Sequence, residues 1–356
     1  MQKIKLVLAI RSLNIGGAER QFIELVKNID KNIFDILVIT MYGGVQENEI
    51  SCLKEIRYIN LEKKGRFDIK SYFKYKKFLK QFNPDVIYSF LGEMNLFSYW
   101  AKPKNTKLIW GLRASDTNMA KYGKVSEFLF NLQKKYSKNI DKIISNSNKA
   151  ILTHKEYGFF MDRAVVVYNG IDVNRFKKIK EKNNKKIVIG MASRFDVIKG
   201  YDIFAKALNK LFKEFDIEVK IAGDGDKKIK NDFLNILELE YDVELLGDIS
   251  DIERFYNDID ILISASYMEG FSNSIAEAMA CEVACVVTDV GDSKVIVGDT
   301  GIVVKPNEEE LYKGIKTMLN LDYKSLGKKA RQRVIENFSI EKMINNTQKE
   351  ILKCVE

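Results

Sequence analysis

Cysteine, histidine and proline are scarce in this chain of 356 residues, which has four cysteines, three prolines and one histidine. The single histidine, His154, argues against a zinc site and against a Ser-His-Asp triad. Cys281 and Cys285 lack a second Cys/His pair that would complete a metal site, so we expect them to be small core residues.

Long apolar runs are also missing, since no stretch approaches the ~18 residues of a membrane-spanning helix. Lys3 and Lys5 precede only Leu6 to Ile10, an apolar segment too short for a signal peptide. This segment predicts a first β-strand, and we expect the protein to be cytoplasmic.

Hydrophobic residues make up 46% of the chain. The length predicts two domains of roughly 150 to 180 residues, each with its own core. Apolar runs with little alternation indicate strands covered on both faces, as in a parallel sheet. In the first half we expect strands at 4–11, 34–41, 85–90, 107–112, 141–145 and 164–168, and helices at 18–29, 68–82, 93–101, 121–138 and 147–157. In the second half we expect strands at 187–192, 217–222, 243–246, 259–264, 284–288 and 302–304, and closing helices at 307–320, 323–337 and 339–354.

This pattern predicts an α/β fold with two Rossmann-like domains that face each other across a cleft. We expect the first domain at residues 1–172 and the second at 187–338. The charged residues 173–186 are expected to form the linker between them. The last helix, within 339–356, is a candidate to cross back to the first domain.

The segment Glu269-Gly-Phe-Ser-Asn-Ser-Ile-Ala-Glu277 is the most informative part of the sequence. It follows a strand-like apolar run and predicts a tight turn that leads into a helix, an order that presents backbone N–H groups to a phosphate. Glu277 lies about one turn inside that helix, where it can reach a pair of sugar hydroxyls. The segment therefore suits a nucleotide that carries a sugar. The turn residues expected to contact this nucleotide-sugar are Gly270, Phe271, Ser272 and Asn273.

Three other strand ends supply candidate residues. Arg194 and Lys199 follow the strand at 187–192, where two cations can stabilise a departing diphosphate, although a plain surface pair is the alternative. The next two loops offer a glycine-flanked turn and an apolar surface for a nucleobase. The candidate residues of the turn are Gly223, Asp224 and Gly225, and those expected to contact the nucleobase are Leu246 and Ile249.

Gly16 and Gly17 follow the first expected strand and precede a helix. Paired glycines allow a ligand to approach the backbone closely. The spacing is not G-x-G-x-x-G, which argues against a nicotinamide-dinucleotide site. A contact with the acceptor or the transferred sugar and an ordinary turn both remain open.

Asp258 and Asp260 form a D-x-D pair of the kind that binds metals, but they lie at the entrance to a strand. We expect them to solvate a helix end and a strand start. The sequence therefore predicts no essential metal and no cofactor besides the nucleotide-sugar substrate.

Together these segments resemble the retaining, two-domain glycosyltransferases of the GT-B fold known as family 4, over nearly the whole chain. The resemblance is carried by Gly16-Gly17-Ala-Glu-Arg20, Asn169-Gly-Ile-Asp172, Arg194 with Lys199, Gly223-Asp-Gly225, and Glu269 through Glu277. It implies a first domain that binds the acceptor and a second that binds the nucleotide-sugar. We expect a UDP-sugar as the donor, with GDP- and ADP-sugars as the alternatives. The resemblance also implies that Arg194 and Lys199 bind the donor diphosphate. Glu277 would bind the ribose, and Glu269 would face the donor sugar.

Members of this family usually react by front-side substitution, in which the leaving phosphate oxygen takes the proton of the attacking hydroxyl. Such a reaction needs electrostatic support of the leaving group more than a strong base. Many relatives carry a histidine after the strand that here is Lys107 to Trp110, and this chain has Arg113 there. Arg113 can hydrogen-bond a sugar or a phosphate but cannot act as a neutral base.

Residues 62–82 hold eight cations and only two carboxylates, which accounts for most of the net charge of +9. With Asp68 as N-cap, helical spacing places Tyr75 and Leu79 on an apolar arc and Phe73 among the lysines of the other side. The lysines expected at a membrane surface or a lipid diphosphate are Lys70, Lys74, Lys77 and Lys80. A solvated helix face is the alternative. Nucleic acid is disfavoured because no recognised nucleic-acid module accompanies the charge.

We therefore predict a retaining, metal-independent glycosyltransferase that acts at the inner face of the cell membrane as a peripheral protein. Its acceptor would be a polyprenyl-diphosphate-linked or growing glycan, as in capsule, O-antigen or glycoprotein-glycan assembly. Two alternatives remain. One is a nucleotide-sugar epimerase on the same fold, which the lack of histidines disfavours. The other is a non-catalytic membrane-associated nucleotide-binding protein, which Arg113 favours.

Overall fold

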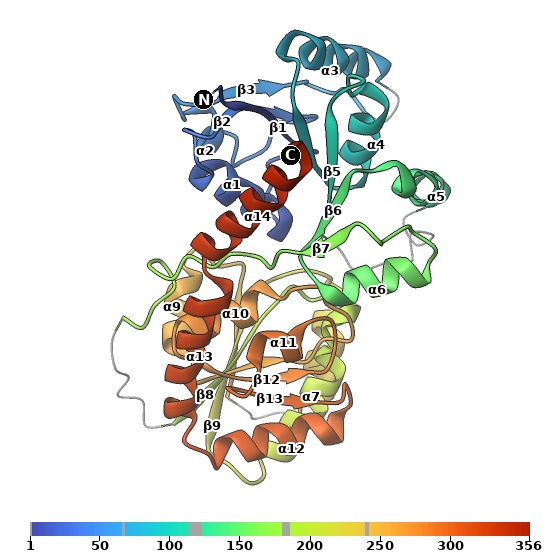
Figure 1. Ribbon diagram of the computed structural model, residues 1–356. Helices are drawn as coiled ribbons and strands as arrows, with labels where there is room; N and C mark the ends of the chain where they lie inside the picture. Colours follow the sequence, from blue (N-terminus) through green and yellow to red (C-terminus); the bar gives the residue numbers. More distant parts are fainter. Residues whose placement is uncertain (1, 66–67, 114–122, 180–185, 239–241) are drawn as a thin grey trace. The chain divides into compact units, whose positions relative to one another are not determined.

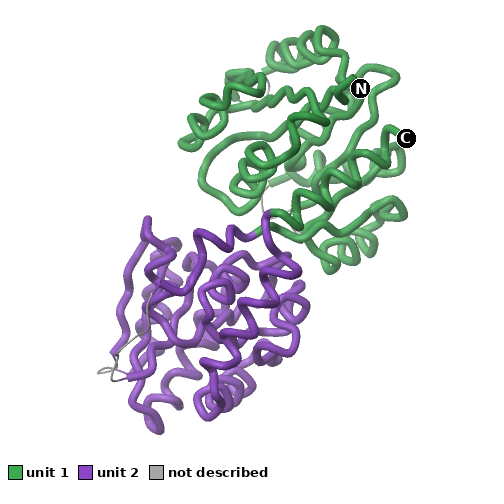
Figure 2. The backbone as a smooth tube through the Cα atoms, turned by 60° about the vertical axis from the view of Figure 1, so that its left-hand side comes forward, with its two compact units in different colours: residues 1–170, 341–356 green, residues 171–340 purple. Residues whose placement is uncertain are grey.

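The computed structural model describes residues 2–65, 68–113, 123–179, 186–238 and 242–356. The chain folds into two compact units, which Figure 2 shows in green and purple. Unit 1 consists of Met1–Gly170 and Glu341–Glu356, and unit 2 of Ile171–Ile340. Residues 180–185 of the expected linker lie outside the described residues.

Unit 1 is built on a seven-stranded parallel sheet with the strand order β3-β2-β1-β4-β5-β6-β7. Its central strands are buried on both faces because helices cover each side, which explains their nearly unbroken apolar sequences (Figure 1). The strands are β1 (Ile4–Ile10), β2 (Phe34–Thr40), β3 (Arg57–Asn60), β4 (Val86–Phe90), β5 (Lys107–Leu112), β6 (Lys142–Ser145) and β7 (Ala164–Val166). The helices are α1 (Gly17–Asn28), α2 (Asn48–Ser51), α3 (Ile69–Phe82), α4 (Gly92–Ala101), α5 (Lys124–Tyr136), α6 (Asn148–Glu156) and α14 (Ile340–Val355).

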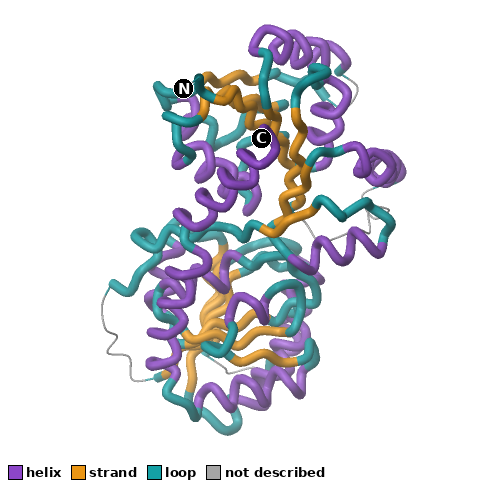
Figure 3. The backbone as a smooth tube through the Cα atoms, in the orientation of Figure 1, coloured by secondary structure: helices purple, strands orange, loops and turns teal. Residues whose placement is uncertain are grey.

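Unit 2 contains a six-stranded parallel sheet with the order β10-β9-β8-β11-β12-β13, and Figure 3 shows its strands between layers of helices. The strands are β8 (Ile187–Ala192), β9 (Ile217–Ala222), β10 (Val243–Gly247), β11 (Ile261–Ser264), β12 (Ala284–Thr288) and β13 (Ile302–Val304). The helices are α7 (Tyr201–Leu211), α8 (Lys227–Ile236), α9 (Ile252–Asp258), α10 (Asn273–Ala280), α11 (Ser293–Val297), α12 (Glu308–Leu319) and α13 (Tyr323–Phe338), with a 3₁₀ turn at Val197–Lys199. The predicted α/β class with two Rossmann-like sheets is confirmed.

Each sheet has one position where the strand order reverses. In unit 1, β1 pairs with both β2 and β4, and in unit 2, β8 pairs with both β9 and β11. At such a position the loops that leave neighbouring strands turn to opposite sides, and the crevice between their carboxyl ends is where α/β proteins bind ligands. We call this position the switch point of each sheet.

The sequence analysis missed strand β3 and the short helix α2. Strand β3 is an edge strand whose residues are exposed or half-buried, and its sequence has no apolar run. It becomes a strand because it pairs with β2, with Leu37 opposite Arg57 and Thr40 opposite Asn60. Local sequence carries little of that information.

The basic helix α3 has the predicted amphipathic character. The carboxylate of Asp68 accepts a hydrogen bond from the backbone N–H of Ser71 at 3.3 Å and caps the helix. Tyr75, Leu79 and Phe82 are buried against the sheet. None of the described helices has the length and apolarity required to cross a membrane.

The last helix, α14, belongs to unit 1 for most of its length. The ammonium of Lys142, at the start of β6, lies 2.7 Å from the carboxylate of Glu350. The side-chain oxygen of Gln348 accepts a hydrogen bond from the backbone N–H of Asp30 at 2.7 Å. These contacts bind the C-terminal residues of the chain to its first unit.

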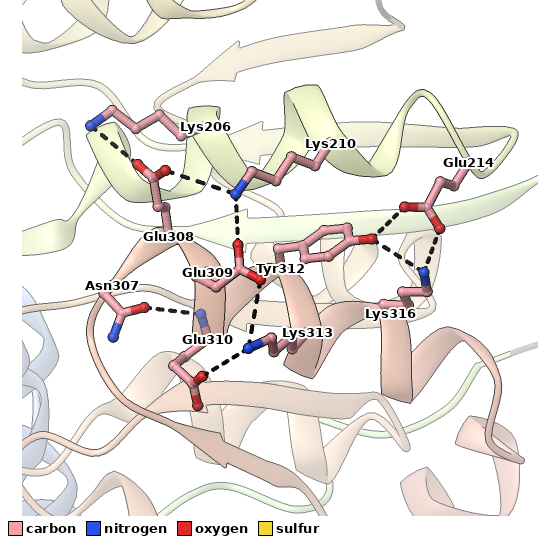
Figure 4. Close-up of polar contacts among 10 residues, drawn as sticks. All are labelled: Lys206, Lys210, Glu214, Asn307, Glu308, Glu309, Glu310, Tyr312, Lys313 and Lys316. Atoms are coloured by element: carbon pink, nitrogen blue, oxygen red, sulfur yellow. Dashed lines mark hydrogen bonds and ion pairs between the residues drawn. The ribbon is translucent and has the colours of Figure 1, made fainter.

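A network of ion pairs connects α7 and the turn that follows it to α12 on the surface of unit 2 (Figure 4). Lys210 lies 2.7 Å from Glu309, and Lys316 lies 2.6 Å from Glu214. The ammonium of Lys316 and the hydroxyl of Tyr312 both hydrogen-bond Glu214 and hold the pKa of its carboxyl below the usual range. Lys210 lowers the pKa of Glu309 in the same way.

Helix α13 packs closely against the turn before β12 at Gly327. A Cβ at this position would lie 2.0 Å from the carbonyl oxygen of Glu282 in the turn before β12. An alanine normally stabilises a helix by roughly 0.5–1 kcal/mol relative to glycine. We expect Gly327→Ala to lower the free energy of unfolding instead, by on the order of 1–3 kcal/mol. Urea unfolding measures this, with Ser325→Ala in the same helix as the control, and a stabilised Gly327→Ala variant would contradict the packing.

The α7–α12 network predicts an acid-dependent loss of stability. A carboxyl whose folded-state pKa is depressed stabilises the fold above its unfolded pKa of about 4.3 and loses that effect as the pH falls through the folded value. We expect the melting temperature of the Glu214→Gln, Glu309→Gln double variant to fall less than that of the wild type when the pH is lowered through this range. High salt should shrink the difference because these pairs are exposed. Parallel curves for the two proteins would exclude a contribution from the network.

Candidate functional site

A cation and a carboxylate meet at the switch point of unit 2. Lys199 follows β8, Glu269 follows β11, and the Lys199 Nζ lies 2.6 Å from the Glu269 Oε1. Their side chains are only 19% and 13% exposed. The Ser266 hydroxyl donates to the same carboxylate oxygen at 2.9 Å. The geometry therefore brings together two of the predicted catalytic residues, which lie 70 positions apart in the sequence.

The backbone around Lys199 is fixed by a close approach between two loops. Gly200 has a φ of +68°, and a Cβ there would lie 2.0 Å from the carbonyl oxygen of Ala265. The backbone N–H of Tyr267 donates to the carbonyl of Ile198 at 2.7 Å. Only glycine fits this position, and its small size lets the loop after β8 lie against the end of β11.

Arg194, the second predicted cation, is exposed and forms no hydrogen bond or ion pair with another described residue. The predicted glycine turn lies directly beside it. A Cβ on Gly223 would lie 2.2 Å from the Ser193 carbonyl oxygen, and the backbone N–H of Phe195 donates to the carbonyl of Asp224 at 2.9 Å. The turn thus packs against the loop that carries Arg194 and leaves the guanidinium accessible.

The turn before α10 presents backbone rather than side chains. Phe271 is buried, and its ring packs edge-on against Phe338 at 5.4 Å between centroids. The Gly270 carbonyl accepts a hydrogen bond from the backbone N–H of Asp292 at 3.0 Å. Ser272 is the N-cap residue and makes no side-chain capping bond, and Asn273 begins the helix. The side chain of Phe271 is therefore a core anchor, and what this residue can offer a ligand is its backbone.

Glu277 is 5% exposed, which is unusual for a carboxylate. The fully buried Tyr256, on α9, donates its hydroxyl to the Glu277 Oε2 at 3.0 Å. Arg175 and Glu253 form an ion pair nearby, and the charge of Glu277 also contributes to the raised pKa of Arg175 after the larger effect of Glu253. Burial of a charged group is tolerated when such partners compensate for lost water.

Sequence reasoning missed Tyr256 and Ser266. Both act on the predicted carboxylates through a hydroxyl, on Glu277 and Glu269 respectively. Neither residue belongs to a motif, and a serine in a loop or a tyrosine in a helix gives no signal of function by itself. Only the folded structure shows which carboxylate each hydroxyl reaches.

Leu246 and Ile249 line a surface depression of about 550 Å³ after β10. The depression carries charge as well as apolar surface, because Lys220 and Glu244 on adjacent strands lie 3.5 Å apart within it. Its remaining lining residues are Asp248, Ser250, Asp251, Arg254, Phe255 and Asp258.

The predicted site residues of unit 1 lie at the ends of β1 and β5. Gly16 has extended backbone and precedes α1, which begins at Gly17. The Arg113 guanidinium donates to the Tyr88 hydroxyl at 2.7 Å and to the Asn169 side-chain oxygen at 3.3 Å. It also lies 4.5 Å from the centre of the Phe90 ring. Residues 114–122, which follow Arg113, lie outside the described residues.

The lysines of the basic segment differ in their surroundings. Lys70, Lys77 and Lys80 are exposed, whereas Lys74 donates to the carbonyl oxygens of Asn60 and Leu61 at 3.2 and 3.4 Å. The exposed apolar side chains on the same helix are Ile69 and Phe73, at 67% and 61%. Arg66 of the predicted cluster lies outside the described residues.

The D-x-D pair lies where the sequence analysis placed it. Asp260 accepts a hydrogen bond from the backbone N–H of Val188 at 2.9 Å, and Asp258 ends α9 and lies 3.8 Å from Arg254. Across the described part of the chain, no group of three or more His, Cys, Asp or Glu side chains is arranged to hold a metal ion. His154 is buried in unit 1 between aromatic rings, and burial lowers its pKa.

Comparison with known proteins identifies two matching families and several similar structures. Residues 15–175 match the family described as Glycosyltransferase Family 4, and residues 186–321 match the family described as Glycosyl transferases group 1. The chain resembles Anabaena HepE in complex with UDP with a TM-score of 0.81 and 19% identity, covering 98% of this chain and 100% of that one. At this level of identity the structural likeness concerns the fold.

Two transferases of Campylobacter jejuni are similar to most of the chain. One is the N-acetylgalactosamine-N,N'-diacetylbacillosaminyl-diphospho-undecaprenol 4-alpha-N-acetylgalactosaminyltransferase, 28% identical over 89% of this chain and 91% of that one. The other is the GalNAc-alpha-(1->4)-GalNAc-alpha-(1->3)-diNAcBac-PP-undecaprenol alpha-1,4-N-acetyl-D-galactosaminyltransferase, 27% identical over 80% of this chain and 78% of that one. The chain belongs to family 4 of the group 1 glycosyltransferases, retaining enzymes of the GT-B fold that transfer a sugar from a nucleotide-sugar donor.

Proposed function

We propose that this protein transfers a sugar from a UDP-sugar to a polyprenyl-diphosphate-linked glycan at the cytoplasmic face of the membrane. The observation that carries the donor half of the proposal is the contact between Lys199 and Glu269 at the switch point of unit 2. The acceptor half is supported by the two Campylobacter relatives, whose names specify undecaprenyl-diphosphate-linked substrates.

The donor would lie along the carboxyl edge of the unit 2 sheet. Lys199 and the accessible Arg194 provide positive charge for its diphosphate, because charge-assisted bonds to phosphate are strong. Glu269 would accept hydrogen bonds from the sugar, with the backbone of 270–273 nearby. Glu277, oriented by Tyr256, would bind the ribose hydroxyls. Leu246 and Ile249 would contact the base at the depression after β10.

The reaction would proceed on one face of the donor sugar. The acceptor oxygen forms a bond to the anomeric carbon while the bond from that carbon to the phosphate oxygen breaks. The leaving phosphate oxygen takes the proton of the acceptor hydroxyl, so the protein need not supply a base. Its contribution is to stabilise the charge that develops on the diphosphate, which Lys199, held by Glu269, and the accessible Arg194 can do.

Helix α3 supports a location at a membrane surface. Its exposed lysines Lys70, Lys77 and Lys80 accompany Ile69 and Phe73, two apolar side chains that are mostly exposed. A face that combines cations with exposed apolar residues suits the interface of an anionic bilayer. Such a position would hold the enzyme beside a lipid-linked acceptor.

The donor assignment predicts different defects for two variants. Lys199→Ala should lower kcat by about 10²- to 10³-fold, because it removes a group that stabilises the leaving charge. Glu277→Gln should weaken UDP binding by about tenfold and roughly halve the thermal shift that UDP produces at about 100 times its dissociation constant. Initial rates with UDP-sugars and a thermal-shift panel of UDP, GDP and ADP measure these effects.

Lys206→Ala is the matched control for Lys199→Ala, since Lys206 lies on the adjacent helix α7 and its ion pair with Glu308 is on the surface (Figure 4). This control should retain both turnover and nucleotide binding. If no nucleotide shifts the melting temperature of the wild type, the proposed donor site is wrong.

The membrane assignment predicts a charge-dependent loss of vesicle binding. Reversing Lys70, Lys77 and Lys80 to glutamate should reduce sedimentation with phosphatidylglycerol-containing vesicles by at least about tenfold, given roughly 1 kcal/mol per cation near the surface. The matched control reverses three exposed lysines of α13, Lys324, Lys328 and Lys329, for the same change in net charge. Equal losses of vesicle binding in both triple variants would show that only the net charge of the protein matters. They would contradict a specific role for α3.

A further inference from the structure

A second cation–carboxylate pair lies at the switch point of unit 1. Arg11 follows β1, and Glu93 lies in the first turn of α4, which follows β4. The Arg11 Nε lies 3.3 Å from the Glu93 Oε2. Arg11 and Glu93 therefore occupy the same place in the unit 1 sheet as Lys199 and Glu269 occupy in the unit 2 sheet. Each pair joins the two loops that diverge where the strand order reverses.

Lys63 supports Glu93 from inside the protein. Its side chain is fully buried, and its Nζ lies 3.2 Å from the Glu93 Oε1. The same ammonium also donates to the Tyr42 hydroxyl, at 3.2 Å, and to the Gly65 carbonyl. An ammonium has three donors, and these three acceptors can use all of them. Lys63 thus orients the carboxylate but is not placed to bind a ligand itself.

The backbone under the pair is held in place by neighbouring loops. The N–H groups of Met41 and Tyr42 donate to the Arg11 carbonyl at 3.1 and 2.9 Å. The N–H of Lys63 donates to the Met41 carbonyl at 2.9 Å. A Cβ on Gly44 would lie 2.2 Å from the carbonyl carbon of Leu13, so the loops after β1 and β2 are in direct contact. These bonds fix the backbone from which the Arg11 side chain extends.

The groups that a ligand can reach have no net charge. The Arg11 side chain is 54% exposed and that of Glu93 is 22% exposed. Among the described residues, the terminal nitrogens of the Arg11 guanidinium have no hydrogen-bond acceptor, so several N–H donors point to solvent. The partly exposed ring of Tyr42 lies 5.5 Å from the guanidinium carbon and adds an apolar surface.

This combination suits a neutral ligand with many hydroxyl groups better than a phosphate. A sugar both donates and accepts hydrogen bonds, so it can use the carboxylate and the guanidinium together. A diphosphate would gain from Arg11 but would be repelled by Glu93, only 3.3 Å away from it. The Tyr42 ring, over which both Arg11 and Lys63 lie, adds apolar surface beside the pair.

We infer that Arg11 and Glu93 form a subsite that binds the hydroxyl groups of the acceptor's terminal sugar and distinguishes sugars by them. Lys63 and Tyr42 are its supporting residues. This inference rests on the proposed function, because it assigns an acceptor site to the same enzyme. A site that hydrogen-bonds substrate hydroxyls discriminates strongly among sugars that differ in one hydroxyl. The pair would therefore determine which acceptor is used rather than how fast the donor reacts.

Saturation-transfer NMR tests the subsite with defined probes. The probes are the methyl α-glycosides of N-acetylgalactosamine, N-acetylglucosamine, galactose, glucose and mannose, each added to the full chain. We expect at least one of them to give a signal with the wild type and a signal lowered by about tenfold in Arg11→Met and in Glu93→Gln, since each variant loses charge-assisted hydrogen bonds.

Arg57→Met is the matched control. Arg57 is 57% exposed and pairs with Asp35, so the change removes a comparable surface ion pair outside the switch point. It should keep the sugar signal. Glu93→Gln leaves an amide oxygen for Lys63, and the melting temperature of each variant shows whether it is folded. Should Glu93→Gln fail to fold, Arg11→Met alone decides the outcome.

Three results would overturn the inference: no signal from any of the five sugars, equal signals in the wild type and both variants, or displacement of the sugar by inorganic pyrophosphate. UDP binding is measured on the same samples by thermal shift. Loss of UDP binding with sugar binding retained would refute the donor site and leave the subsite intact. UDP binding without a sugar signal would refute only the subsite.

Discussion

Parallel pairing of the strands is the constraint on which every candidate site in this protein depends. Every described strand pairing within the two sheets is parallel, so the loops that follow the strands gather at one edge of each sheet. Where the strand order reverses, side chains from two distant loops come within reach of each other. Lys199 meets Glu269 there in unit 2, and Arg11 meets Glu93 in unit 1.

The carboxylates of the candidate sites are held by hydroxyls and by a buried ammonium. Ser266 and Tyr256 donate to Glu269 and Glu277, and Lys63 lies against Glu93. Taking a carboxylate out of water is costly unless hydrogen bonds replace the lost hydration. The same bonds fix the direction of each carboxylate.

Most of the fold could be predicted because its strands are buried on both faces. Strand β8 has the predicted bounds of 187–192, and β9 those of 217–222. The edge strand β3 was missed because its residues Arg57–Asn60 are half-exposed and only pairing with β2 makes them a strand. The sequence also grouped Lys74 with the exposed lysines of α3, whereas its ammonium is bound to the carbonyls of Asn60 and Leu61.

The α/β class, the family and the segments that carry Arg194, Lys199, Glu269 and Glu277 could all be identified from the amino-acid sequence, because glycine turns, helix starts and apolar strands are local features. Which of these charged groups are in contact depends on the folded chain. The contact between Lys199 and Glu269 and the bond from Tyr256 to Glu277 span 70 and 21 positions. The Arg11–Glu93 contact spans 82. Such pairs exist only once the strand order of each sheet is set, and no local pattern encodes that order.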